Sequence, residues 1–212
     1  LEEPLWRRFA PAHSQDAAEI LLSKLAMAGQ DEQGHWRPTV AGLLLGSREP
    51  HKHLSGAFIQ AVAYRGTTIA PEGERAYQRD GLDITGTLDS QILEAVAFVR
   101  KNMKTAAEKR APGGRKDLAQ FSLLAVFEAV ANAVAHRDYS MAGSKVRLRL
   151  FDDRLELYSP GMLSNTMTPE SLAFRQASRN EALTSLLARC PVGDGSLAAH
   201  RQHILDKRGE GV

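Results

Sequence analysis

The chain has 212 residues, enough for one large domain or two small ones, either of which could bury a hydrophobic core. Charged residues make up 25% and hydrophobic residues 43%, and a net charge of +2 is too small to indicate nucleic-acid binding by itself.

The single cysteine, Cys190, excludes a disulfide framework within the chain, indicates a reducing, cytoplasmic location and is expected to be a packing residue. No apolar run reaches the length of a membrane span, so no membrane partner is expected. The sequence starts at Leu1 without an initiator methionine and without a signal pattern, and we expect the chain to be a portion of a longer protein.

Hydrophobic periodicity and turn residues predict the elements of the first half in order. They are an amphipathic helix over 14–29 with Ser14 as N-cap and Gly29 as C-terminal stop, a polar turn or short hairpin over 31–38, a helix capped by Thr39 or a buried strand over 39–46, a strand over 57–65, a loop or edge ribbon over 67–81, a short strand over 83–88, and a helix capped by Asp89 that runs to about Lys104.

Cations gather between 100 and 116, around the flexible Pro112-Gly113-Gly114. One interpretation is a phosphate or nucleic-acid contact, and the other is a solvated connection between domains. The second is favoured because no aromatic residue alternates with the charges.

The stretch 121–140 predicts a helix with two different faces. Its apolar positions fall on one narrow stripe, which is typical of a buried helix face; they are Leu123, Phe127, Val130 and Val134. Glu128, Asn132 and His136 stand at i, i+4 and i+8, so they line up along the opposite side. Alanines flank that line, namely Ala125, Ala129, Ala133 and Ala135. Small residues beside a carboxylate, an amide and an imidazole indicate that something approaches the backbone closely, although a plain surface pair of Glu128 and His136 would have the same spacing.

After this helix the alternation over 146–158 predicts a hairpin that turns at Asp152-Asp153 and ends at Pro160-Gly161. Asp153 and Arg154 are expected to fix the turn. Thr168 and Pro169 predict a helix start, 180–187 has a helical pattern, and 191–196 predicts a mobile loop.

These motifs together resemble a known family. Glu128-x-x-x-Asn132-Ala, then His-Arg-Asp-Tyr-Ser over 136–140, then a hairpin that closes on Tyr-Ser-Pro-Gly over 158–161 resembles the histidine-kinase-type (GHKL) ATP-binding domain of RecG-like proteins. These are bacterial transcriptional regulators, also called Schlafen AlbA_2 domain proteins. The resemblance runs from about Asp31 to the C-terminus and is densest from Glu128 to Asn180.

The resemblance implies an α+β fold in two parts. Residues 1–88 would be the C-terminal part of an AlbA_2-like α/β domain. In the family, a segment similar to residues 38–46 marks the end of the AlbA_2-like region. Residues 89–212 would form a GHKL-type (Bergerat) two-layer α/β sandwich that is incomplete at its C-terminus.

The resemblance also implies ATP and Mg²⁺ as cofactors. Asn132 would hold the Mg²⁺ ion that bridges the phosphates, since Mg²⁺ prefers oxygen ligands and is usually held by few protein groups. Glu128 would be the catalytic residue that orients or deprotonates the attacking water. His136 and Arg137 would contact phosphate, although an arginine at this helix end is also favourable to the helix dipole for purely structural reasons.

Further nucleotide contacts are implied at two glycine boxes. Ser159 stands where the superfamily has an adenine-binding Asp, and a hydroxyl accepts a hydrogen bond from an adenine amine less strongly than a carboxylate does. Gly161 follows it. Gly209 and Gly211 form the second box, placed after the mobile loop, where backbone N–H groups can hold phosphates.

The first functional hypothesis is therefore a nucleotide-binding, RecG-like transcriptional regulator, with DNA contacted through segments outside this chain and a homodimer as an expected assembly. Whether ATP is hydrolysed stays open. The alternative is a nucleic-acid-binding or dimerisation scaffold whose nucleotide pocket is vestigial. Gly-x-x-x-x-Gly-Lys-Ser/Thr does not occur in the chain, so no helicase motor is predicted.

Overall fold

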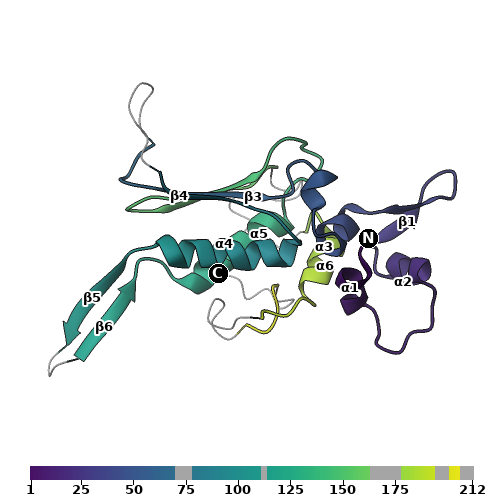
Figure 1. The fold of residues 1–212 in the computed structure, drawn as a ribbon, viewed down its shortest axis with the longest axis horizontal. Helices are drawn as coiled ribbons and strands as arrows, with labels where there is room; N and C mark the ends of the chain where they lie inside the picture. Colours follow the sequence, from purple (N-terminus) through teal and green to yellow (C-terminus); the bar gives the residue numbers. More distant parts are fainter. Residues whose placement is uncertain (70–77, 111–113, 163–177, 194–200, 206–212) are drawn as a thin grey trace.

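The computed structural model describes residues 1–69, 78–110, 114–162, 178–193 and 201–205. Figure 1 shows the resulting arrangement of a sheet lined by helices, with a separate hairpin at one end. The elements in chain order are α1 (Glu3–Trp6), η1 (Arg7–Phe9), α2 (Ala18–Lys24), β1 (Ala28–Gln30), β2 (Trp36–Pro38), α3 (Val40–Gly46), η2 (Pro50–Lys52), β3 (Ile59–Tyr64), β4 (Gln78–Ile84), α4 (Leu88–Asn102), β5 (Thr105–Arg110), β6 (Gly114–Ala119), α5 (Leu123–Ala135), β7 (Val146–Leu150), β8 (Leu155–Tyr158) and α6 (Glu181–Leu187).

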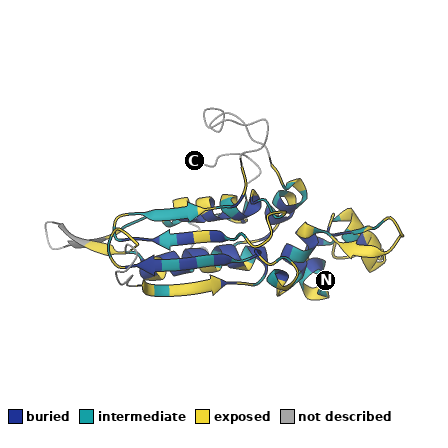
Figure 2. Ribbon diagram, turned by 90° about the horizontal axis from the view of Figure 1, so that it is seen from above, coloured by how far each residue is buried: buried dark blue, intermediate teal, exposed yellow. Residues whose placement is uncertain are grey.

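A four-stranded mixed sheet with the order β4-β3-β7-β8 organises the molecule. β3 runs parallel to β7, whereas the β3–β4 and β7–β8 pairs are antiparallel. Alternation in β7 buries Val146, Leu148 and Leu150 against the helices, as the sequence predicts. Helices α4 and α5 lie along this face of the sheet (Figures 1 and 2). The expected mixed α+β class is confirmed. The division at residue 88 stays a prediction, and the sheet takes two strands from each side of it.

The N-terminal part contains a shorter helix than the sequence predicts. The expected helix over 14–29 is limited to α2, which starts after Ala17, and Ser14 contacts Asp16 instead of capping it. The helix ends early because Ala26 adopts a left-handed conformation with φ 55°, and Gly29 belongs to β1. The segment 31–38, expected as a polar turn or a short hairpin, is part of a hairpin. Its first strand, β1, lies before that range and pairs with β2.

The two readings of 39–46 are resolved in favour of a helix. Thr39 caps α3, because its side-chain oxygen accepts a hydrogen bond from the backbone N–H of Gly42 at 3.0 Å. Helix α3 is largely buried, with Leu44 and Leu45 fully enclosed.

Around β4 and α4 the predicted boundaries shift. The strand expected over 83–88 is β4, which begins at Gln78 and pairs with β3 at the edge of the sheet, so part of the predicted loop is strand. Helix α4 starts at Leu88 with Thr87 at the N-cap, and Asp89 lies in its first turn. The carboxylate of Asp89 is not a cap; it forms an ion pair with Arg8 at 2.6 Å.

The cation-rich stretch forms a hairpin, which the sequence did not predict. β5 and β6 pair from Thr105 with Ala119 to Arg110 with Gly114, and the hairpin projects from the body of the protein (Figure 1). Its base is closed by two hydrogen bonds between Lys104 and Gln120, both 2.9 Å long.

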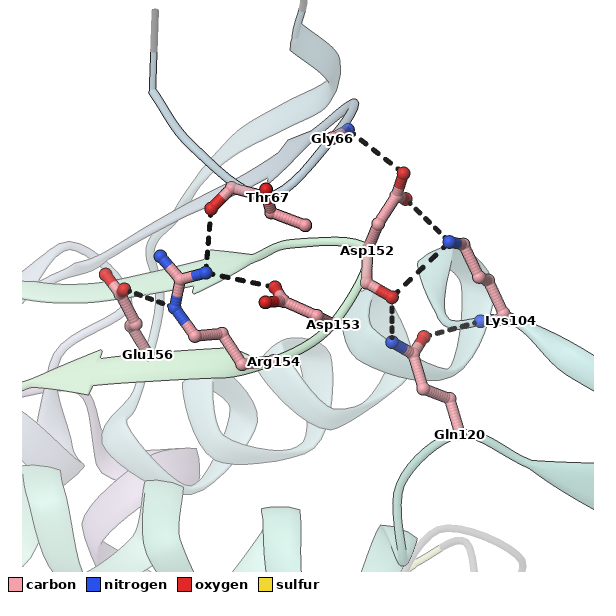
Figure 3. A network of polar contacts seen from close by, with 8 residues as sticks. All are labelled: Gly66, Thr67, Lys104, Gln120, Asp152, Asp153, Arg154 and Glu156. Carbon is pink, nitrogen blue, oxygen red and sulfur yellow. Dashed lines mark hydrogen bonds and ion pairs between the residues drawn. The ribbon is translucent and has the colours of Figure 1, made fainter.

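Asp152, in the β7–β8 turn, ties this hairpin base to the sheet (Figure 3). Its carboxylate accepts a hydrogen bond from the backbone N–H of Gly66 at 3.0 Å and pairs with Lys104 at 3.1 Å. The ammonium of Lys104 lowers the pKa of the Asp152 carboxyl. The Gln120 amide donates to the Asp152 carbonyl at 2.9 Å, so segments from four parts of the chain meet at one turn.

The neighbouring Arg154 performs the turn-fixing role predicted for it. Its guanidinium donates to the Thr67 carbonyl at 2.7 Å and pairs with Asp153 at 3.0 Å and with Glu156 at 2.8 Å (Figure 3). These contacts hold the end of the β7–β8 hairpin beside the loop that follows β3.

Candidate functional site

Helix α5 is the element on which the candidate site is built. Ser122 caps it by accepting a hydrogen bond from the Ala125 N–H, and the helix ends at Ala135, shortly before the end expected at Arg137. Phe127, Val130 and Val134 are buried in the core, which confirms the predicted apolar face. Ala125 and Ala129 are exposed and Ala133 is half-buried, as expected, whereas Ala135 is buried because it lies on the core side.

The predicted polar line is present, but its three members have different surroundings. Glu128 is only 9% exposed, Asn132 is exposed, and His136 is exposed at the C-cap, just past the last helical residue. The side chains of the line therefore change from buried at Glu128 to exposed at Asn132 and at His136, where the helix ends.

Glu128 is engaged by a residue that the sequence did not reveal. Arg201 forms an ion pair with Oε1 of Glu128, and its guanidinium also lies 5.9 Å from the centre of the Phe127 ring. Within the described residues Oε2 of Glu128 is buried and has no hydrogen-bond partner. A buried carboxylate oxygen without a donor is costly, so this atom is a place where a donor would be stabilised.

Asn132 is an exposed member of the polar line. Its side chain makes no hydrogen bond to any other residue in the described ranges, and the neighbouring helix positions Ala129 and Ala133 carry only methyl groups. The amide oxygen is free to act as a ligand, and a planar or charged group can approach the helix backbone beside it.

The imidazole of His136 lies near the Arg179 guanidinium. Partial burial is the larger cause that lowers the pKa of His136, and the positive charge of Arg179 lowers it further. The neutral form is therefore favoured at physiological pH, and in this form one ring nitrogen accepts a hydrogen bond.

Arg137 points into the interior. The residue is 2% exposed, its guanidinium stacks on the Tyr139 ring at 4.5 Å and donates to the Ser144 carbonyl, and burial lowers its pKa. Two of its nitrogens, Nε and Nη1, are buried without partners within the described residues. Gly56 is required beside it, because a Cβ there would lie 2.0 Å from the Ser144 oxygen and 2.4 Å from Nη2 of Arg137. This burial counts against the predicted phosphate contact.

The first glycine box contacts α5 through Ser159. The hydroxyl of Ser159 donates to the Ala133 carbonyl at 2.6 Å, which places it one residue beyond Asn132 along the helix. Its lone pairs remain able to accept. Gly161 has φ 123°, and a Cβ there would lie 2.9 Å from the Cβ of Asp138, so only glycine suits this position.

Arg179 and Asn180 lie beside the C-terminal end of α5, and the sequence did not single them out. Arg179 pairs with Asp138 at 2.7 Å and donates to the Met162 carbonyl. The side-chain amide of Asn180 donates to the carbonyls of Ala135 and Arg137 at 2.8 and 2.9 Å. Asn180 thus supplies the partner of the last carbonyl of α5, while Ser159 and the Tyr139 hydroxyl donate to the two carbonyls before it. The only signal in the sequence was their place just before a helical pattern.

The remaining predicted contacts lie elsewhere. Gly209 and Gly211 are outside the described residues, as is the helix start at Thr168. In the part of the chain that the structure describes, no cluster of three His, Cys, Asp or Glu residues could hold a metal ion. Asn132 fits Mg²⁺ as a single oxygen ligand, with phosphates and waters completing the shell.

A family model matches the last third of the chain. Residues 143–212 match the profile of the family described as "Putative ATP-dependent DNA helicase recG C-terminal" (HATPase_c_4). The match supports a RecG-like ATPase-type domain, and such a domain implies ATP binding. It begins just before β7 and therefore includes Ser159 and Gly161, but it does not include α5.

The whole chain is similar in fold to a solved structure. The crystal structure of the DIP2311 protein from Corynebacterium diphtheriae superposes with a TM-score of 0.59 at 23% sequence identity, over 98% of this chain and 37% of that one. The chain thus spans little more than a third of the length of that protein. No curated protein shows significant sequence similarity to the chain. Among the described helices, none combines the length and apolar character needed to cross a membrane.

Proposed function

We propose that the chain binds Mg-ATP along the exposed side of α5, between Asn132 and the Ser159–Gly161 turn. The observation that carries this proposal is the Asn132 side chain, an exposed amide that is bonded to nothing in the described structure and is flanked by alanines. The Asn132 amide has no structural partner in the described residues and lies beside the Ser159–Gly161 turn, which the ATPase-type profile covers. These two features together support a role in binding a ligand.

In this proposal each residue has a separate task. The Asn132 amide oxygen holds Mg²⁺, which supplies charge neutralisation for the phosphates when bound. Ser159 accepts from the adenine amine, directly or through water, and Gly161 lets the turn approach α5 closely. Neutral His136 accepts a hydrogen bond at the open end of the helix. Glu128 is the candidate for orienting an attacking water.

We also propose a regulatory role for the protein, as a cytoplasmic transcriptional regulator of the RecG-like, AlbA_2 plus GHKL type. Nucleotide occupancy would then alter an assembly, such as a homodimer, or a DNA-binding segment outside this chain. Weak hydrolysis is compatible with this role, since a switch needs only a change between bound states.

Binding is tested by ligand-induced stabilisation. Mg-ATP at about a hundredfold its dissociation constant should raise the free energy of unfolding by roughly 2.7 kcal/mol if it binds only the folded chain. Asn132→Ala should remove this gain, whereas Gln33→Ala, which changes an exposed amide in the β1–β2 turn, should retain it. If millimolar Mg-ATP stabilises neither the parent chain nor a longer form of the protein, the ATP proposal is wrong.

A second candidate function has its own observation. The β5–β6 hairpin projects from the body, and its sequence is rich in lysine and arginine (Figure 1). If the nucleotide pocket is vestigial and the protein is a nucleic-acid scaffold, DNA binding should weaken steeply with salt and should survive Asn132→Ala. Replacing Lys109, Arg110, Arg115 and Lys116 by serine should then abolish it.

A further inference from the structure

The ion pair between Glu128 and Arg201 occupies the Glu128 carboxylate. One oxygen is taken by the guanidinium, and the other is buried with no partner in the described residues. The side chains are only 10% and 18% exposed, for Glu128 and Arg201 respectively. A general base must reach the proton it abstracts, so this arrangement is an inactive one.

The backbone of Arg201 is held in place by its neighbours. Pro191 and His203 form a β-bridge, the Val192 N–H donates to the Gln202 carbonyl at 2.9 Å, and the Ile204 N–H donates to the Cys190 carbonyl at 2.9 Å. The backbone of Arg201 is thus fixed beside α6, and its long side chain reaches α5. Its guanidinium can change partners by rotation about side-chain bonds while the backbone stays where it is.

A triphosphate on Asn132 would compete with Glu128 for this guanidinium. Asn132 lies one helical turn from Glu128, about 6 Å along the helix surface. Guanidinium groups stay charged in proteins and bind phosphate and carboxylate with the same two-pronged geometry.

We propose that Arg201 is a phosphate-binding residue of the nucleotide site, held on Glu128 in the ligand-free chain and transferred to the terminal phosphate of a nucleoside triphosphate. This inference rests on the proposed nucleotide site. The transfer frees the Glu128 carboxylate, so the candidate base becomes available only when a triphosphate is present. A diphosphate, which lacks the terminal group, leaves the ion pair in place.

The proposal is tested by a double-mutant cycle on nucleotide affinity. The dissociation constants of Mg²⁺ with a β,γ-imido ATP analogue and of ADP are measured by titration calorimetry for the parent chain, Glu128→Gln, Arg201→Met and the double variant. Glu128→Gln should strengthen analogue binding about tenfold, because Arg201 no longer has to leave a carboxylate. Arg201→Met should weaken analogue binding about tenfold and leave ADP affinity unchanged.

The double variant separates this effect from simple charge repulsion. If Glu128 only repels the phosphates, the gain from Glu128→Gln persists in the Arg201→Met background, and the proposal is overturned. The proposal requires that the gain disappear there. Arg201→Lys, which keeps a cation but not the two-pronged geometry, should give an intermediate affinity and provides the test if Arg201→Met fails to fold.

Failure of this inference is distinguishable from failure of the nucleotide site. If ADP and the analogue bind equally well to all four chains, the site stands and the role of Arg201 is refuted. If neither nucleotide binds to the parent chain, the proposed function fails and this inference fails with it.

Discussion

Asn180→Ala tests whether one side chain closes the C-terminal end of α5. The variant removes both hydrogen bonds from the amide, those to the carbonyls of Ala135 and Arg137. Each such bond contributes about 0.5–1.5 kcal/mol, so the free energy of unfolding should fall by about 1–3 kcal/mol. Urea unfolding followed by circular dichroism measures this change.

Asn180→Asp provides a sharper comparison because it keeps the shape of the side chain. A carboxylate has no donor for the two carbonyls, and it adds negative charge at the helix end where the dipole is already negative. The order of stability should therefore be parent, then alanine, then aspartate. Asn132→Ala is the control on the same helix, and it should change stability by less than about 0.5 kcal/mol, since that amide has no partner in the described structure.

The reasoning is refuted if Asn180→Asp proves as stable as Asn180→Ala at neutral pH. Equal stability would mean that the two carbonyls find water instead of the amide. A large loss in Asn132→Ala would show, in turn, that this residue supports the fold and is not free for a ligand.

Two further predictions concern titratable groups. The pKa of His136 should lie below the usual 6.5, and Arg179→Met should raise this pKa, as measured by NMR titration of the ring. A lowered pKa in the folded chain means that the unfolded chain binds the proton more tightly. The His136 contribution to the free energy of unfolding should therefore fall as the pH drops through 6.5 toward the folded pKa. A pKa at or above 6.5 would contradict the arrangement. Burial raises the pKa of the Cys190 thiol to about 12. A disulfide reagent at pH 8 should therefore modify the folded chain only as fast as the chain unfolds. Rapid labelling without denaturant would refute this packing of Cys190.

The local parts of the fold and site were predictable from the sequence because their signals are periodic. The buried face of α5 and the alternation in β7 follow from spacings of 3.6 and 2 residues. The segment 39–46 stayed open between helix and strand, because so short an apolar run has no distinguishing period. Helix ends were less predictable, since α2 stops at a left-handed Ala26 that no residue preference indicates.

The contacts that complete the candidate site were not predictable, because they join residues far apart in the chain. Arg201 reaches Glu128 across 73 positions, and Asn180 reaches Ala135 across 45. A single sequence carries no record of such pairs. For Arg137 the sequence left a phosphate contact and a helix-dipole role open. Its burial against Tyr139 depends on the space left by Gly56, which no local pattern shows.

The parallel pairing of β3 with β7 also sets an order of events during folding. The β3–β4 hairpin and α4 can form from local contacts, but the second edge of β3 stays unpaired until Val146–Leu150 arrives, more than 80 residues later. During synthesis the growing chain therefore carries an open strand edge beside apolar residues such as Ile59 and Ala61. A fragment that ends after α5 keeps that edge open, and we expect it to associate with itself.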